Sequence, residues 1–292
     1  MMQRAAPPLQ RSYRAPGLEL AGRRFEWGSR TYVMAIVNVT PDSFSGDGLA
    51  DDVAAAVALA RQFEAAGADI LDIGGESTRP GAEPLSPGDE AARVLPALRA
   101  IRAATSLPIS IDTCHAAVAQ AALDAGACVV NDIMGLRSDP EMAGVVARSG
   151  AALVAMHNQR GRQFHDVAGD IAAGFEASLA LAAHAGVDPA RIVLDPGFGF
   201  GWAPEHNLEM VRRLPELWRF DLPLLIGPSR KSTLGLVLDL PVEERVEGTA
   251  AAVALAIAGG ADIVRVHDVR EMVRVCRVAD AIARDNWRPE PG

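Results

Sequence analysis

A repeated alternation of short apolar runs and alanine-rich stretches constrains the fold of this 292-residue chain more than any other feature. After each apolar run comes a loop rich in Gly, Pro and Asp, and then a stretch with helical spacing. Apolar runs of this kind are typical of strands buried on both faces, and strands that alternate with helices form βαβ units. Strands are expected at 33–37, 70–73, 109–111, 129–131, 153–156, 192–194, 224–226 and 263–266, and helices at 51–66, 89–103, 115–125, 139–149, 170–185, 205–213, 243–258 and 268–284.

Eight strand–helix units predict a (β/α)₈ TIM barrel over residues 31–286, preceded by an N-terminal extension at 1–30. The alternative is a doubly wound open sheet, which for a dinucleotide would need G-x-G-x-x-G after the first strand; NVTPDSF stands there instead. A short hairpin is predicted within the extension. If the extension is a solvated arm, its removal is tolerated; if it packs on the barrel, its removal costs solubility.

Charge and composition exclude several classes of protein. The 28 Lys and Arg against 37 Asp and Glu give a net charge of −9, which argues against a nucleic-acid partner. Three scattered cysteines form no disulfide framework, and the most apolar window is interrupted by Gly and Asp, so a membrane partner is not expected. The N-terminus lacks the apolar core of a signal peptide. These features predict a soluble, cytoplasmic protein that acts on small molecules.

Polar side chains stand at or just after the end of each expected strand. In a barrel of this type the active site lies at the carboxyl ends of the strands, so these side chains are the first candidates for a site. They are Asn38, Asp72, Asp112, Asn131, His157, Asp195, Lys231, Arg265 and His267.

The last two strands carry the residues suited to an anion. GPSRKSTLG (227–235) leads from a strand into a helical start, where Lys231 and free backbone N–H groups would cradle a phosphate; a Ser cap beside a solvated Lys is the alternative. Arg265 and His267 lie two apart and point the same way. A ligand anion at Arg265 is favoured over a structural ion pair with an Asp, which stays open.

The carboxylates and the amide favour a flat ligand with N–H donors. Asp112, Asn131 and Asp195 would accept from the amino-imino edge of a planar heterocycle, and Phe198 or Phe200 would wall it or pack in the core. A metal-hydrolase site is the rival, but the expected His-x-His is absent. Two long loops, 38–52 and 74–90, have the composition of mobile lids.

These segments together resemble the dihydropteroate synthase family of folate biosynthesis. The matching segments are AIVNVTPDSFS (35–45), DIGGESTRPGA (72–82), ISIDT (109–113), VVNDI (129–133), MH (156–157), LDPGFGF (194–200), GPSRKS (227–232) and RVHD (265–268). The resemblance implies a barrel transferase that joins p-aminobenzoate to (7,8-dihydropterin-6-yl)methyl diphosphate with Mg²⁺. It also implies a homodimer.

The resemblance further implies the role of each matching residue. Asp112, Asn131, Asp195, Lys231, Met156 and Phe200 would line the pterin pocket; Asn38, Arg265 and His267 would hold the diphosphate, with Asn38 also approaching Mg²⁺; Thr78, Arg79, Pro80, Phe44 and Ser232 would shape the p-aminobenzoate site. Lys231, Arg265, His267 and Asp112 would be catalytic. The chain departs from the family pattern in the loop 156–166, at Trp202 and over 112–118.

The residue types fit a dissociative displacement, in which an anion hole receives the leaving diphosphate and carboxylates stabilise a ring cation. Positive charge is expected on one side of the mouth and negative charge on the other. Two rivals are a pterin-binding methyltransferase domain that passes a methyl group from methyltetrahydrofolate to a corrinoid, and a non-catalytic pterin-binding paralogue.

Overall fold

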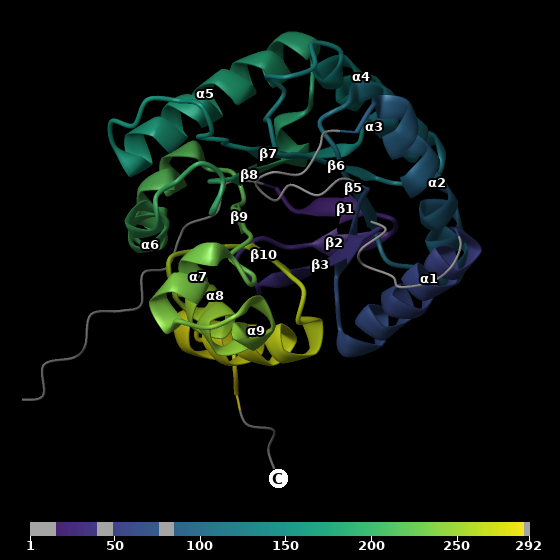
Figure 1. Ribbon diagram of the computed structural model, residues 1–292. Helices are drawn as coiled ribbons and strands as arrows, with labels where there is room; N and C mark the ends of the chain where they lie inside the picture. Colours follow the sequence, from purple (N-terminus) through teal and green to yellow (C-terminus); the bar gives the residue numbers. More distant parts are fainter. Residues whose placement is uncertain (1–15, 40–48, 76–84, 289–292) are drawn as a thin grey trace, which may run out of the picture.

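The computed structural model describes residues 16–39, 49–75 and 85–288, with side chains from residue 53 onward in the second range, and its central feature is a parallel eight-stranded sheet (Figure 1). Around the sheet the helices form an outer ring. The strands are β3 (Tyr32–Asn38), β4 (Ile70–Gly74), β5 (Ile109–Asp112), β6 (Val129–Asp132), β7 (Ala152–Met156), β8 (Ile192–Asp195), β9 (Leu225–Ile226) and β10 (Ile263–Val266). The helices are α1 (Leu49–Ala66), α2 (Pro87–Ala104), α3 (Ala116–Asp124), α4 (Met142–Ser149), α5 (Val167–Ala185), α6 (Pro204–Arg213), α7 (Ser232–Leu238), α8 (Val246–Ala258) and α9 (Val269–Ala283).

The sheet closes into a barrel. Its strand order is β8-β7-β6-β5-β4-β3-β10-β9, and each neighbouring pair is parallel. The two ends of this order meet, because Leu194 on β8 donates its backbone N–H to the carbonyl of Pro223 at 2.9 Å and bridges to Leu224 before β9. The predicted barrel is therefore confirmed, and the open sheet is wrong. The eight expected helices and strands are all present, within about three residues at each end.

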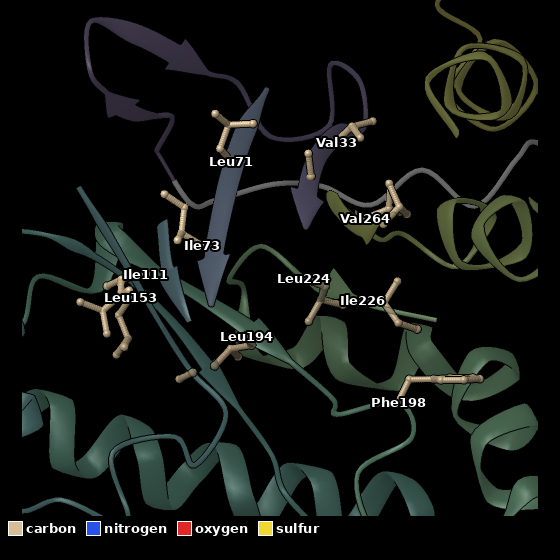
Figure 2. Close-up of a cluster of buried hydrophobic side chains, with 14 of the residues drawn as sticks. Val33, Leu71, Ile73, Ile111, Leu153, Leu194, Phe198, Leu224, Ile226 and Val264 are labelled. Carbon is tan, nitrogen blue, oxygen red and sulfur yellow. The ribbon is translucent and has the colours of Figure 1, made fainter. Parts of the chain in front are cut away.

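Each strand is buried on both faces, which explains the continuous apolar runs in the sequence. Side chains such as Val33 and Leu71 pack outward against the helices, in the cluster drawn in Figure 2. The alternate residues, among them Met34 and Ile70, pack in a second cluster inside the barrel. Two faces of one strand thus contribute to two different cores.

A hairpin of β1 (Leu18–Leu20) and β2 (Arg23–Phe25) closes the amino-terminal end of the barrel. Leu18, Leu20 and Phe25 belong to the interior cluster, together with residues at the starts of strands such as Tyr32, whose ring centroid lies 4.6 Å from that of Phe25. Of the two alternatives for the extension, packing on the barrel therefore holds for the hairpin. Because this end is sealed by apolar side chains, the opposite end is left for a site.

Replacing Phe25 by Ala is expected to lower the free energy of unfolding by about 3 kcal/mol or more, because the buried ring leaves a cavity beneath the barrel. Urea unfolding followed by circular dichroism measures this change. Phe164→Ala is the control, since that ring is 43% exposed, and it should cost less than about 1 kcal/mol. Equal effects of the two substitutions would show that the hairpin does not seal the barrel.

Candidate functional site

The barrel interior changes from apolar to polar toward the carboxyl ends of the strands. Along β4 the interior positions are Ile70 and then Asp72, and along β10 they are Ile263 and then Arg265. Neighbouring strands are parallel and in register, so their polar residues meet at one mouth. At the strand ends, Asp112 on β5 pairs with Asn131 on β6, and Met156 on β7 pairs with Asp195 on β8. The topology thus gathers side chains that are far apart in sequence.

Arg265 lies at the centre of this polar group. Its Nε donates to Oδ2 of Asp72 and its Nη2 to Oδ2 of Asp112, both at 2.6 Å. Burial by itself would lower the pKa of the guanidinium, but the carboxylates of Asp72 and Asp112 outweigh burial and raise it. Asn131 completes the group by donating Nδ2 to Asp72 Oδ2 at 3.0 Å. Four residues from four strands therefore form one connected network.

Two carboxyl groups in the mouth titrate far above their usual range. Burial raises the pKa of Asp112 to about 7, although Arg265 opposes this, and burial raises the pKa of Asp195 to about 6. Asp195 is held by the backbone N–H of Gly197, which donates to its Oδ1 at 2.8 Å. Raised carboxyl pKa values inside a polar mouth mark candidates for contact with a ligand.

Lys231 immediately precedes α7 and packs against an aromatic ring of the β8–α6 loop. Its Nζ lies 4.1 Å from the ring centroid of Phe200, a cation–π contact. Burial and the nearby Arg265 lower the pKa of the amine to about 8, while Asp195 and Asp112 oppose the shift. The ammonium therefore lies within electrostatic range of both carboxylates.

Lys231 is also the single lysine of the chain, since arginine accounts for 27 of the 28 Lys and Arg residues. Arginine occupies all the other Lys and Arg positions of the chain, and only position 231 carries an ammonium group. Arginine is not equivalent at a buried site, because its planar guanidinium is larger and does not lose its proton. This compositional signal was available in the sequence and marks Lys231 as a position that needs a compact cation.

His267 follows β10 and is held by Ser229 from the loop after β9. Ser229 Oγ accepts the backbone N–H of His267 at 3.1 Å and lies 3.0 Å from its Nδ1. Burial, together with Arg265 and Arg230, lowers the pKa of the imidazole to about 4, so the ring is neutral at pH 7. When the Ser229 hydroxyl donates to Nδ1, the ring proton lies on Nε2, available to an acceptor.

The loop that departs from the family pattern packs directly on this site. Gln159 donates its backbone N–H to the carbonyl of Phe200 at 3.0 Å, and its side-chain Oε1 accepts from Nε2 of His157 at 2.8 Å. The Arg160 guanidinium lies 5.0 Å from the Phe200 ring centroid, and the Trp202 ring lies 5.6 Å from that of His157. The residues that depart from the family pattern therefore pack around Phe200 and do not replace it as an apolar wall of the site.

The remaining predicted residues divide into two groups. Asn38 ends β3, Met156 is buried at the end of β7, and Ser232 is exposed at the start of α7, beside Lys231. Phe44, Thr78, Arg79 and Pro80 lie outside the described residues.

The structure changes the expected charge pattern, and it gives a place in the site to two residues to which the sequence assigned no role. Positive and negative groups do not occupy opposite sides, because Arg265 lies between Asp72 and Asp112. The structural ion pair that the sequence left open thus exists in this state. Asp72 and Ser229 received no role from the sequence; for Asp72 the signal was a carboxylate in the middle of the buried run ILDIG.

No group of three or more His, Cys, Asp and Glu that could hold a metal ion occurs in the described part of the chain. Asn38 brings one neutral amide oxygen to the mouth, at an interior position two residues after Ile36. Mg²⁺ keeps several waters and takes one or two protein ligands beside substrate phosphates. The donor set at Asn38 therefore fits Mg²⁺ that arrives with a diphosphate.

A separate cavity of about 760 Å³ lies at the sealed end, between α9 and the chain segments that lead into β3 and β4. Three of its charged lining residues already have partners, since Arg30 pairs with Asp69 and Asp280 accepts from Thr31 and Arg284. None of the predicted site residues lines it. The mouth, and not this cavity, is the candidate site.

No described helix has the length and apolar character needed to cross a membrane.

Comparison with known proteins identifies the family. The model of the family described as "Pterin binding enzyme" matches residues 34–267. A dihydropteroate synthase of Synechocystis sp. is 48% identical over 284 residues, which cover 94% of this chain and 97% of that protein. The structure of Xanthomonas albilineans dihydropteroate synthase with 4-aminobenzoic acid is 40% identical, with a TM-score of 0.87, and the match covers 92% of this chain and 98% of that one. The same enzyme in complex with 7,8-dihydropteroate is 38% identical, with a TM-score of 0.83 and coverage of 91% and 98%. The chain therefore belongs to the pterin-binding enzyme family, among its dihydropteroate synthases.

Proposed function

We propose that this chain joins p-aminobenzoate to (7,8-dihydropterin-6-yl)methyl diphosphate and releases 7,8-dihydropteroate and diphosphate. The observation that carries the proposal is the connected group of Asp72, Asp112, Asn131 and Arg265 at the mouth, with Lys231 and Asp195 in electrostatic range. This group offers acceptors for a flat ring and cations for a leaving anion. The named substrate and product complexes of similar enzymes support the same reaction.

The pterin ring is proposed to bind among Asp112, Asn131, Asp195 and Lys231. Carboxylate and amide oxygens accept the N–H groups of the ring edge, and the Lys231 ammonium donates to a ring acceptor. Met156 and Phe200, both buried, provide the apolar walls. A pocket of this kind stabilises positive charge on the ring, because two carboxyl groups face it in a poorly solvated place.

The diphosphate is proposed to bind at Arg265, His267 and Asn38. The neutral His267 donates from Nε2, and Arg265 supplies a fixed positive charge that does not depend on pH. Mg²⁺ held by Asn38 would neutralise charge on the departing diphosphate. The p-aminobenzoate site is proposed at Ser232 together with Thr78, Arg79, Pro80 and Phe44.

The displacement is proposed to be dissociative. The C–O bond to the diphosphate breaks first, and its electron pair leaves with the diphosphate, so that the methylene carries a cation delocalised into the pterin ring. The lone pair of the p-aminobenzoate nitrogen then forms the new C–N bond, and its proton passes to solvent or to the diphosphate. The protein needs no strong base; it needs Arg265 for the leaving group and Asp112 and Asp195 for the cation.

We also propose a homodimer, a cytoplasmic location and a division into an extension (1–30) and a catalytic barrel (31–286). Leu236 and Val237 on α7 and Leu255 on α8 are more than 60% exposed, which supports burial against a second copy. The small number and scattered positions of the three cysteines support a reducing compartment. Sedimentation of the purified chain tests the dimer.

An assay of diphosphate release tests the reaction. Release is expected only when both p-aminobenzoate and the pterin diphosphate are present, and dihydropteroate should form in equal amount. A pterin-binding methyltransferase would instead transfer a methyl group from methyltetrahydrofolate to a corrinoid. A non-catalytic paralogue would bind pterin and release nothing.

Lys231→Ala is expected to lower kcat/KM by about three orders of magnitude, because it removes a cation that faces the carboxylates and the bound ring. Lys231→Arg should restore little, since the larger guanidinium cannot occupy the place of the ammonium against Phe200. Arg270→Ala, at an exposed position of α9, is the control and should retain full activity. A loss of less than about tenfold in the Ala variant contradicts the proposed role.

Because Lys231 is the single lysine, its titration is directly measurable. Reductive methylation with ¹³C-formaldehyde should give one ε-dimethylamino signal beside that of the α-amino terminus, and Lys231→Arg identifies it by its loss. In the folded protein this signal should titrate near pH 8, and in urea near its usual value of 10.5. Since the folded state releases the proton first, stability should rise with pH between these values. A folded-state pKa near 10.5 would place the amine in solvent.

A further inference from the structure

Asp72 is a buried carboxylate to which the reaction proposed above assigns no contact with a substrate. It lies on β4 inside the barrel, flanked by Ile36 on β3 and Ser110 on β5, and its side chain is 0% exposed. By contrast the Asp112 side chain remains 13% exposed at the mouth. Asp72 is therefore the deeper of the two carboxylates that hold Arg265, behind the surface that a ligand would touch.

Both donors that reach Asp72 converge on a single oxygen. Oδ2 accepts Nε of Arg265 at 2.6 Å and Nδ2 of Asn131 at 3.0 Å. Within the described residues, Oδ1 of Asp72 is buried and has no hydrogen-bond partner. Such an arrangement leaves a buried carboxylate short of donors, which costs stability unless the carboxylate serves another purpose.

The contact with Asp72 decides which way the Asn131 amide is turned. An ionised carboxylate only accepts hydrogen bonds, so it selects the NH₂ group of the amide and turns the amide oxygen away from itself. The oxygen is then available as an acceptor. With Asp72 in place, Asn131 joins Asp112 and Asp195 as acceptors, a set that matches a row of N–H donors.

Asp72 also determines which N–H donors of Arg265 reach Asp112. Because Nε is bound to Asp72, the guanidinium plane is fixed, and Asp112 receives only Nη2. Without Asp72, Arg265 would be free to turn both donors toward Asp112 in a bidentate pair. That pair would occupy the oxygens with which Asp112 accepts from a ligand.

We infer that Asp72 is a positioning residue for recognition of the pterin edge: it orients the Asn131 amide oxygen toward the ligand and holds Arg265 so that Asp112 keeps free acceptor capacity. The inference rests on the proposed function and deepens it. Asp72 itself does not touch the ligand.

The pKa of Asp112 is a readout that would not change if Asp72 had a purely structural role. The charged groups that face Asp112 are Arg265 from β10, Asp72 from β4, Glu90 from α2 and Lys231 from the start of α7. Burial raises the pKa of Asp112 to about 7; Arg265 and Lys231 lower it, and the negative charges of Asp72 and Glu90 raise it. Removing the charge of Asp72, and freeing Arg265 for Asp112, would both lower that pKa.

The experiment compares kcat and KM for the pterin diphosphate between pH 5.5 and 9 at saturating p-aminobenzoate. The kcat/KM profile of the parent should fall on the acid side near pH 7, because protonated Asp112 loses its negative charge and can no longer accept N–H groups of the ring at both oxygens. In Asp72→Asn, KM should rise about tenfold at pH 7.5 while kcat stays within about threefold, and the acid limb should move down by about half a pH unit or more.

Two further variants separate charge, position and general stability. Asp72→Glu keeps the charge but displaces the carboxylate, so KM should rise while the acid limb stays near that of the parent. Asp69→Asn is the matched control, because it is the same chemical change in another buried carboxylate, just before β4 at the sealed end, where it pairs with Arg30. It should lower stability and leave KM and the acid limb unchanged.

An acid limb of Asp72→Asn that overlays that of the parent, or a KM that does not rise, overturns the inference. If Asp72→Asn does not fold, as judged by circular dichroism, Asp72→Glu and calorimetric binding of 6-hydroxymethylpterin still decide it, because unchanged affinity in that variant contradicts positioning. A parent chain that forms no dihydropteroate would overturn the proposed function instead, so the two failures are distinguishable.

Discussion

The buried guanidinium of Arg265 is the interaction on which the functional end of this barrel depends. A positive charge inside a closed barrel is unfavourable unless carboxylates surround it. Asp72 on β4 and Asp112 on β5 provide them, at 2.6 Å each, although β3 separates these strands from β10. When both carboxyl groups are ionised, these three side chains carry one net negative charge, and Asn131 donates a hydrogen bond to Asp72. Neither the cation nor the carboxylates would be tolerated there alone, so the network forms as a unit.

The two ends of the barrel have different roles: one end stabilises the fold, and the other carries the side chains of the candidate site. At the amino-terminal end the hairpin and the first residues of each strand make an apolar plug, with Phe25 against Tyr32. At the carboxyl end the same strands carry charged and amide groups in place of apolar ones. The plug offsets the cost of burying polar groups at the other end. Strand geometry holds Asp72, Asp112 and Arg265 in place, while the loop residues Gly197 and Ser229 hold Asp195 and His267.

The ionisable groups at the mouth differ in how strongly their charge depends on pH. Arg265 stays charged and His267 stays neutral across the neutral range, while Asp112, Asp195 and Lys231 have pKa values of about 7, 6 and 8. A ligand that brings N–H donors or a diphosphate therefore meets groups whose protonation it will change. Binding and pH are linked in this site, because the groups that recognise the ring titrate close to neutrality.

The sequence by itself determined the strands, the helices and the mouth residues, because two-sided burial and helical spacing leave periodic patterns and because each polar residue stands at a strand end. Its motifs also determined the family. Only the tertiary structure decided which groups meet: that Arg265 lies between Asp72 and Asp112, that Ser229 holds His267, and that the hairpin seals the barrel. These contacts join residues up to 193 positions apart, and no local pattern encodes them. They follow from the shear and closure of eight strands, which set the neighbours of each interior side chain.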